Sequence, residues 1–393
     1  MIAHLARRFH LVPLLAVAFL TWLAAPLASA ADYYVDPAGN DSASGTSTAT
    51  PWKSLAKVNA TTFQPGDRIR FKKGGTWVGS LWPKGSGDST AQITLGSYGT
   101  GAKPLIDAQG AETAVIKLSN QEYWTIDGFE VTNWAASDGM RWGIRVESSD
   151  GLVKHRIRVI NNTVRDIYAI MMPDPDPTPG YWVGGIFFAI NEPGRADEVL
   201  IEGNDVRNII GQAICFWGES ENVGGGMNYA NCSPNVVVRK NTVLRTSGDG
   251  ILTLGTDNEL VEYNEVGYVS ELQTNSVNTA AAWPTRHIGG LWQYNHVHHT
   301  RRKGNDGAAF DNDGFTSGTT IFQHNVSHDN EGGFIMEYTW GGDVSAKTIA
   351  RYNISWNDSR IIATNRTTTE LYNNVFTTPE RPSAWNGRPT RAA

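Results

Sequence analysis

The sequence has little that points to a zinc protein, a disordered protein or a nucleic-acid-binding protein. Its 393 residues include two cysteines, Cys215 and Cys232, and two cysteines alone make no zinc site. Charged residues make up 18% of the chain, too few for disorder, and the formal net charge of −6 gives no basic surface for nucleic acid. After residue 30, no stretch is apolar enough to span a bilayer.

The first 30 residues predict a signal peptide. Arg7 and Arg8 precede a mostly apolar stretch from Leu11 to Leu27, and Ala28-Ser29-Ala30 has the small residues of a cleavage site. Prolines interrupt the apolar stretch, which weakens the alternative of a membrane anchor. We expect a mature chain that starts near Ala31, is secreted or periplasmic, and is not attached to a membrane. An oxidising compartment permits a disulfide between Cys215 and Cys232, but the sequence leaves that pairing open.

A short motif centred on asparagine recurs along most of the chain. Each copy has β-favouring residues, an asparagine, and usually a valine two places later, as in VLIEGNDVRNI and VVVRKNTVLRT. The repeated asparagines are Asn162, Asn204, Asn241, Asn264, Asn295, Asn325, Asn353 and Asn373. Their spacing of 20 to 42 residues is typical of a solenoid in which each coil carries loops of variable length.

The residues around each asparagine predict a bend. The residue three places before it is mostly apolar, as in Val159 and Ile201, and so is the residue two places after it, as in Val164 and Val206. These positions have opposite parity, so a straight strand would turn them to opposite faces. A bend at the asparagine, with its backbone in the left-handed region, turns both inward. Stacked coils would then link the amides into a hydrogen-bonded ladder.

A second strand opened by glycine or alanine follows each asparagine, as in GGIFFAI, GQAICFW and GGFIMEY. Over residues 76 to 385 this pattern resembles the pectate-lyase-like superfamily of secreted, carbohydrate-active parallel β-helix proteins. The segment YYVDPAGNDSASGTSTATPWKSLAKV resembles the N-terminal cap of such proteins. The resemblance implies an all-β, single-stranded right-handed parallel β-helix, with a signal peptide over 1–30, a cap over 31–75 and the β-helix over 76–393.

The cap is expected to contain a short helix, because an open solenoid end exposes apolar core. We expect this helix from Pro51 to about Asn59. Thr50 would be its N-cap and Pro51 its first residue. Trp52, Leu55 and Ala56 would then face the first coil.

Carboxylates gather on the later glycine-opened strands and are the candidate catalytic groups. They are Asp249 in SGDGILTL, Asp306, Asp311 and Asp313 in NDGAAFDNDGF, and Glu337 in GGFIMEY. Aligning these strands places Asp306 in the column of Asp249, and Glu337 beside Asp311 or Asn312. Neighbouring strands lie about 4.8 Å apart, so two carboxyls could lie about 5 Å apart, the separation found in retaining glycosidases.

The leading interpretation is a glycoside hydrolase acting on a polysaccharide or oligosaccharide without a cofactor. One carboxyl must be protonated to assist the leaving group and another ionised to attack or to activate water. We expect Asp311 as nucleophile or base, and Glu337 or Asp306 as acid. The candidate substrate-binding residues are Trp283, His287, Arg286, Lys303, Trp217 and Trp340.

Two alternatives remain open from the sequence. The first is a polysaccharide lyase in which aspartates of the cluster hold Ca²⁺ and Lys303 or Arg302 acts as base. The second is a non-catalytic, carbohydrate-binding β-helix. In each case we expect a monomer whose partner is a carbohydrate, with no nucleic acid or membrane partner.

Overall fold

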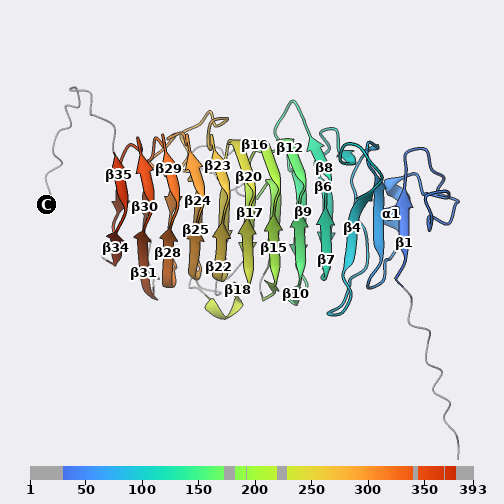
Figure 1. The fold of residues 1–393 in the computed structure, drawn as a ribbon, viewed down its shortest axis with the longest axis horizontal. Coiled ribbons are helices and arrows are strands. Elements are labelled where there is room, and N and C mark those ends of the chain that lie inside the picture. Colours follow the sequence, from blue (N-terminus) through green and yellow to red (C-terminus); the bar gives the residue numbers. More distant parts are fainter. Residues whose placement is uncertain are drawn as a thin grey trace, which may run out of the picture.

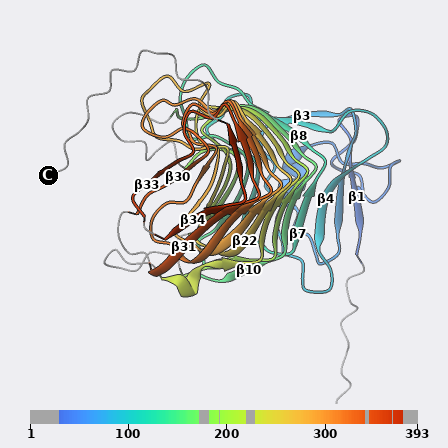
Figure 2. The ribbon, with the colours of Figure 1, turned by 60° about the vertical axis from the view of Figure 1, so that its left-hand side comes forward.

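The protein is described from a computed structural model over residues 30–171, 182–191, 193–218, 228–339, 344–366 and 368–377. In this part of the chain the strands stack into a long solenoid, and Figure 1 shows it with the N-terminal coils at one end and the C-terminal coils at the other. Each coil passes through three parallel sheets in turn, as Figure 2 shows in a view turned toward the end of the stack. The predicted right-handed parallel β-helix is confirmed.

The three sheets are named here in the order in which each coil meets them. The first sheet consists of β1 (Asp32–Val35), β2 (Arg68–Lys72), β4 (Ile93–Tyr98), β7 (Trp124–Asp127), β11 (Ile157–Ile160), β15 (Val199–Glu202), β19 (Val236–Arg239), β22 (Thr256–Glu262), β25 (Ile288–Gln293), β28 (Ser317–Gln323), β31 (Val344–Arg351) and β34 (Thr369–Tyr372), with β18 (Ser233–Pro234) paired to β22. The second consists of β3 (Thr76–Val78), β5 (Leu105–Asp107), β8 (Glu130–Asn133), β12 (Thr163–Tyr168), β16 (Asp205–Ile210), β20 (Thr242–Thr246), β23 (Glu265–Gly267), β26 (His296–His298), β29 (Val326–His328), β32 (Ile354–Trp356) and β35 (Val375–Thr377). The third consists of β6 (Ala114–Ser119), β9 (Trp142–Ser148), β13 (Gly184–Ile190), β17 (Gln212–Gly218), β21 (Ile251–Leu254), β24 (Ala282–Thr285), β27 (Phe310–Asp311), β30 (Ile335–Glu337) and β33 (Ile362–Thr364). A further small sheet pairs β10 (Val153–His155) with β14 (Arg195–Asp197), and Tyr229–Asn231 form a 3₁₀ turn.

The asparagine ladder lies at the junction between the first and second sheets. Asn162 donates from Nδ2 to Oδ1 of Asn204, and the same contact continues from coil to coil as far as Asn374. The apolar residues on either side of each asparagine point inward, and Val159 and Val164 are fully buried. The inward turn of both positions is therefore confirmed.

The bend itself lies one residue earlier than predicted. The ladder asparagines do not have positive φ angles; the residues before them do, with φ between 54° and 68° at Asn161, Gly203, Lys240, Tyr263, Tyr294, His324, Tyr352 and Asn373. The prediction of a left-handed ladder asparagine is therefore wrong. For the same reason Asn373 is the bend residue of the last described coil and Asn374 is its ladder residue. Outside the bend, the rings of Tyr263 and Tyr294 stack with centroids 4.9 Å apart.

The capping helix is shorter than predicted. Helix α1 spans Leu55–Ala60, and its N-cap is Ser54, whose side chain accepts a hydrogen bond from the backbone N–H of Lys57. Thr50 and Pro51 lie before the helix, because Trp52 instead forms a β-bridge with Val35. Trp52 and Leu55 are buried as expected, whereas Ala56 is exposed and Val58 takes the inward position.

The remaining expectations about the chain as a whole have mixed outcomes. Cys215 and Cys232 are both buried, and the structure shows no disulfide between them. In the described ranges, no helix has the length and apolar character needed to cross a membrane. The predicted signal peptide lies outside the described residues, apart from Ala30.

Candidate active site

The outer face of the third sheet changes from apolar to acidic along the stack. Parallel pairing places Phe187, Cys215, Leu252 and Trp283 in one outward column. The register of β24, β27 and β30 then continues this column through Asp311 to Met336. The inward neighbours, such as Ala282 and Phe310, belong to the main core. Asp311 therefore lies in a column of mostly apolar side chains, where a charge is poorly solvated.

A cleft of about 440 Å³ opens at this transition. In the described part of the chain its wall is formed by Asn278, Trp283, Arg302, Asn305, Asp306, Asp313, Met336, Tyr338 and Arg360. Asp306 and Asp313 are the carboxylates on this wall, whereas Asp249 and Asp311 are not among the lining residues. The cleft thus brings together two acids, two arginines and an indole, which matches the chemistry of a sugar-binding site.

Burial and repulsion from neighbouring carboxylates raise the pKa values of Asp306 and Asp249. Burial is the main cause that raises the pKa of Asp306 to about 7, the charges of Asp313 and Asp249 add to it, and Arg360 and Arg302 oppose it. Burial likewise raises the pKa of Asp249 to about 7, although Asp249 accepts hydrogen bonds from the backbone of Ala280 and from Gln212. Both groups therefore exchange protons near neutral pH, as an acid–base catalyst requires.

Asp311 is buried and is not among the residues of the cleft wall, but it forms a hydrogen bond with Asp313. Its carboxyl is 1% exposed. Burial raises its pKa well above the ordinary value, and the charges of Asp313 and Asp306 raise it further. A hydrogen bond with Asp313 also favours the protonated form of Asp311. A hydrogen bond donated by a neutral carboxyl stabilises the charged form of the carboxyl that accepts it, so the contact with Asp311 favours the ionised form of Asp313 over the neutral form.

A polar network inside the β-helix anchors the strand that carries these two aspartates. Asn312 lies between them in sequence and points inward, where its Nδ2 donates to Oγ1 of Thr348 at 2.8 Å. Nε2 of His287 lies 3.2 Å from Oδ1 of Asn312, and Nδ1 of His287 lies 3.0 Å from Oε1 of Glu259. These side chains are fully buried, so the network fixes the residue between Asp311 and Asp313 from behind.

Two predictions about the acidic cluster are wrong in detail. Ile251 pairs with Ala282, and Ala282 with Phe310, so the residue in the column of Asp249 is Ala308 rather than Asp306. The register shifts because the segment after Gly307 contains two more residues before its strand than the alignment assumed.

Glu337 lies in the interior and not on the outer face beside Asp311. Its neighbour Met336 points into the cleft, so strand alternation turns Glu337 to the other side. There Glu337 is fully buried and accepts hydrogen bonds from Thr369 and Thr364. Of the two predicted neighbours of Glu337, the register gives Asn312 and not Asp311. Both Asn312 and Glu337 are buried in the interior, so the prediction that Glu337 is a catalytic acid on the outer face is wrong.

The predicted substrate-binding residues are also divided by the structure. Trp283 lines the cleft, as expected. His287 does not reach it, because His287 belongs to the interior network. Arg286 turns toward Phe315, with its guanidinium carbon 5.6 Å from the ring centroid, and Lys303 is not among the described residues of the cleft wall.

The remaining tryptophans lie away from the cleft wall or outside the description. Trp217 packs against Trp182 with ring centroids 4.4 Å apart, on coils that precede the cleft. Trp340 lies outside the described residues.

Several residues of the cleft have no distinctive pattern in the sequence and were not predicted. Asn278 and Asn305 lie in segments without strand periodicity, and Arg360 lies in a turn before β33. The outward direction of Tyr338 could have been predicted, because Tyr338 follows Met336 by two positions.

The comparisons with known proteins agree with the fold. No family model matches the chain. A lacto-N-biosidase of Bifidobacterium longum subsp. longum is 25% identical over 88% of this chain, and the chain spans only 27% of that protein's length. Native and selenomethionine crystal structures of the GH136 lacto-N-biosidase from Eubacterium ramulus are 21% identical, each with a TM-score of 0.71. They cover 88% and 89% of this chain respectively, and the match covers 68% of each of those chains. The chain is therefore similar in fold to a lacto-N-biosidase over most of its length.

Proposed function

We propose that this chain is a glycoside hydrolase that cleaves an oligosaccharide in the cleft formed by Asp306 and Asp313. The main support for this proposal is that the two carboxylates share one cleft wall in different electrostatic settings. Asp306 has a pKa of about 7, which makes it a proton donor near neutral pH, whereas Asp313 accepts a hydrogen bond from protonated Asp311. A glycosidase needs this combination of one acid and one ionised carboxylate.

The roles follow from position and charge. Asp306 donates a proton to the leaving oxygen, and Asp313 attacks the sugar or activates water on its other face. Asp311 is a positioning residue, because it is buried, forms a hydrogen bond with Asp313 and does not line the cleft. This assignment replaces the expectation that Asp311 itself is the nucleophile or base.

The other wall groups suit a neutral sugar. Trp283 offers an apolar ring face for stacking, and Arg302 and Arg360 offer several N–H donors for hydroxyl or carbonyl oxygens. The likeness to lacto-N-biosidase supports an oligosaccharide of that type as substrate. We further propose that the mature chain acts outside the cytoplasm as a monomer and needs no metal for the reaction.

The test is an assay of the full mature chain on two substrates. The first is a p-nitrophenyl lacto-N-bioside, and the second is a lacto-N-tetraose whose leaving group is a sugar. Hydrolysis should proceed unchanged in EDTA. Release of an unsaturated, UV-absorbing product from a uronate polymer, lost in EDTA, would instead establish the lyase.

Single substitutions test the residues. Asp313→Asn should abolish turnover of both substrates. Asp306→Asn should lower kcat on the sugar leaving group by about 10²- to 10⁴-fold, and less on p-nitrophenol, which needs little protonation. Asp257→Asn, on β22 of the first sheet, is the matched control. Near-normal rates in both cleft variants would refute the assignment.

A further inference from the structure

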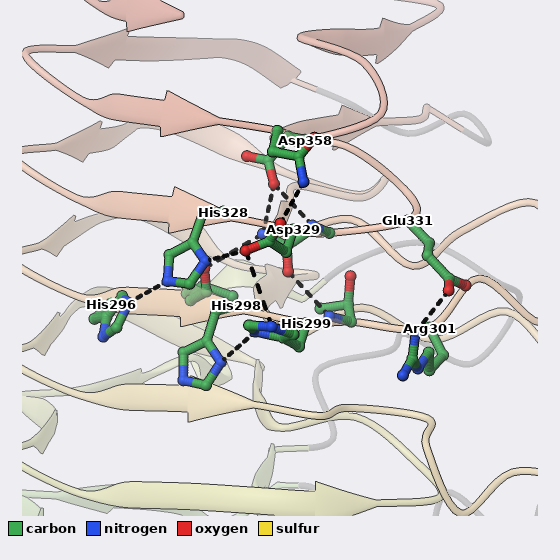
Figure 3. A network of polar contacts seen from close by, with 12 residues as sticks. His296, His298, His299, Arg301, His328, Asp329, Glu331 and Asp358 are labelled. Carbon is green, nitrogen blue, oxygen red and sulfur yellow. Dashed lines mark hydrogen bonds and ion pairs between the residues drawn. The ribbon is translucent and has the colours of Figure 1, made fainter. Parts of the chain in front are cut away.

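Histidines gather on the outer face of the second sheet, away from the interior. The alternation of β26 turns Val297 into the core and His296 and His298 outward. His298 pairs in register with His328 on the next coil and with Gly267 on the previous one. Figure 3 shows His296, His298, His299 and His328 directed toward one another, with Asp329 beside them. The proposed function makes no use of this cluster.

Three groups of this cluster converge on one point. One ligand atom each from Glu265, His296 and His298 lies within 4.8 Å of the others. Nε2 of His298 is 3.5 Å from Oε1 of Glu265. Two ligand atoms on a tetrahedral Zn²⁺, each at about 2.0–2.1 Å from the metal, lie about 3.3 Å apart. The observed separation therefore needs only a small adjustment to hold such an ion.

Neighbouring groups orient the imidazoles as a metal site requires. Nδ1 of His298 lies 3.0 Å from Nδ1 of His299. A proton on Nδ1 of His298 leaves its Nε2 lone pair facing Glu265. Nδ1 of His328 lies 2.6 Å from Oδ2 of Asp329, and its Nε2 lies 2.9 Å from Nε2 of His296. Carboxylate–histidine pairs of this kind accompany metal ligands in proteins.

A second group, made of His299, His328 and Asp329, converges less favourably. Both oxygens of Asp329 are engaged in the described structure, by His328 and by Asn357. Nε2 of His299 is 3.9 Å from Oδ2 of Asp329. This group thus acts as the outer shell that orients the first.

We propose that Glu265, His296 and His298 bind one divalent transition-metal ion, with Zn²⁺ as the expected ion. Two imidazoles and a carboxylate form a donor set that suits Zn²⁺ better than Ca²⁺ or Mg²⁺, which prefer oxygen ligands. The ion would join β23 and β26, which pair on successive coils of the second sheet.

The experiment is titration of the mature full chain with ZnCl₂ by isothermal titration calorimetry, after removal of any histidine tag. We expect one zinc per chain and no comparable heat from MgCl₂ or CaCl₂. Co²⁺ in place of zinc should give the visible absorption bands of a tetrahedral site. Zinc should also raise the Tm of the protein, because it binds the folded chain.

The variants separate this site from adventitious binding. His298→Ala and Glu265→Gln should each weaken zinc binding by more than tenfold. His324→Ala, which removes an exposed histidine outside the cluster, should bind zinc like the parent chain. The Glu265 side chain is 45% exposed, so Glu265→Gln keeps the test valid even if His298→Ala unfolds. Less than one zinc per chain, or equal weakening in the Glu265→Gln and His324→Ala variants, would overturn the proposal.

Discussion

Replacing Asn295 with alanine should remove a central link of the asparagine ladder. Oδ1 of Asn295 accepts from the backbone N–H and from Nδ2 of Asn264, at 3.1 and 3.0 Å. Its Nδ2 donates to the carbonyl of Val261 at 2.9 Å and to Oδ1 of Asn325 at 3.1 Å. The side chain is only 2% exposed, so water does not replace these bonds.

The size of the effect follows from these four contacts. A buried hydrogen bond contributes about 0.5–1.5 kcal/mol net, so the loss of four predicts a decrease of about 2–6 kcal/mol in the free energy of unfolding. Unpaired donors and acceptors left on the two neighbouring coils favour the upper part of this range. For a domain stable by about 5–15 kcal/mol, this is a large fraction.

Guanidinium chloride unfolding, followed by both tryptophan fluorescence and far-UV circular dichroism, measures this change. Two probes are needed because repeat proteins do not always unfold in one step. The control is Asn161→Gly, which changes an exposed bend residue with φ of 55° that glycine adopts without strain. A loss below about 1 kcal/mol for Asn295→Ala, or an equal loss for the control, would show that the ladder hydrogen bonds do not supply this stability.

Two further predictions concern the cleft and the network behind it. The value of kcat/KM should fall about tenfold per pH unit above pH 7, because Asp306 with its pKa of about 7 must be protonated to act as acid; a pH profile that keeps this limb in Asp306→Asn would assign it to another group. His287→Ala should lower the free energy of unfolding by about 2–4 kcal/mol, because it removes the contacts of a buried imidazole with Glu259, Asn312 and Thr320. Chemical denaturation measures this loss, with the exposed His324→Ala expected to change stability by less than about 0.5 kcal/mol; a matching value for His287→Ala would show that the interior network contributes little.

The fold was predictable because the same asparagine motif recurs at the same bend in each coil. Most of the ladder asparagines lie between two inward apolar positions, and Val159 and Val164 illustrate the pattern that stacking requires. The position of the bend was not predictable in this way, because residues as different as Lys240 and Tyr263 adopt the left-handed conformation. Ladder bonds and ring stacking hold them there, and both depend on the neighbouring coil.

The site was predictable in composition but not in register. Aspartates within a strand-like segment indicated chemistry, and Asp306 and Asp313 do line the cleft. A shift of one residue decides whether a side chain faces solvent or core, and this parity placed Glu337 inside. Arg360 lines the cleft although it lies more than twenty residues after Tyr338 in the sequence, and no local sequence pattern predicts this position.

The asparagine ladder makes the stacking of the coils independent of the length of the segments between them. Successive ladder residues are between 21 and 42 positions apart, yet every Nδ2–Oδ1 distance lies between 2.9 and 3.1 Å. Segments inserted between coils therefore change length without altering the stacking of the coils that carry them. A designer could exchange such segments, one coil at a time, and so reshape the walls around Asp306 and Asp313 while the scaffold keeps its pitch.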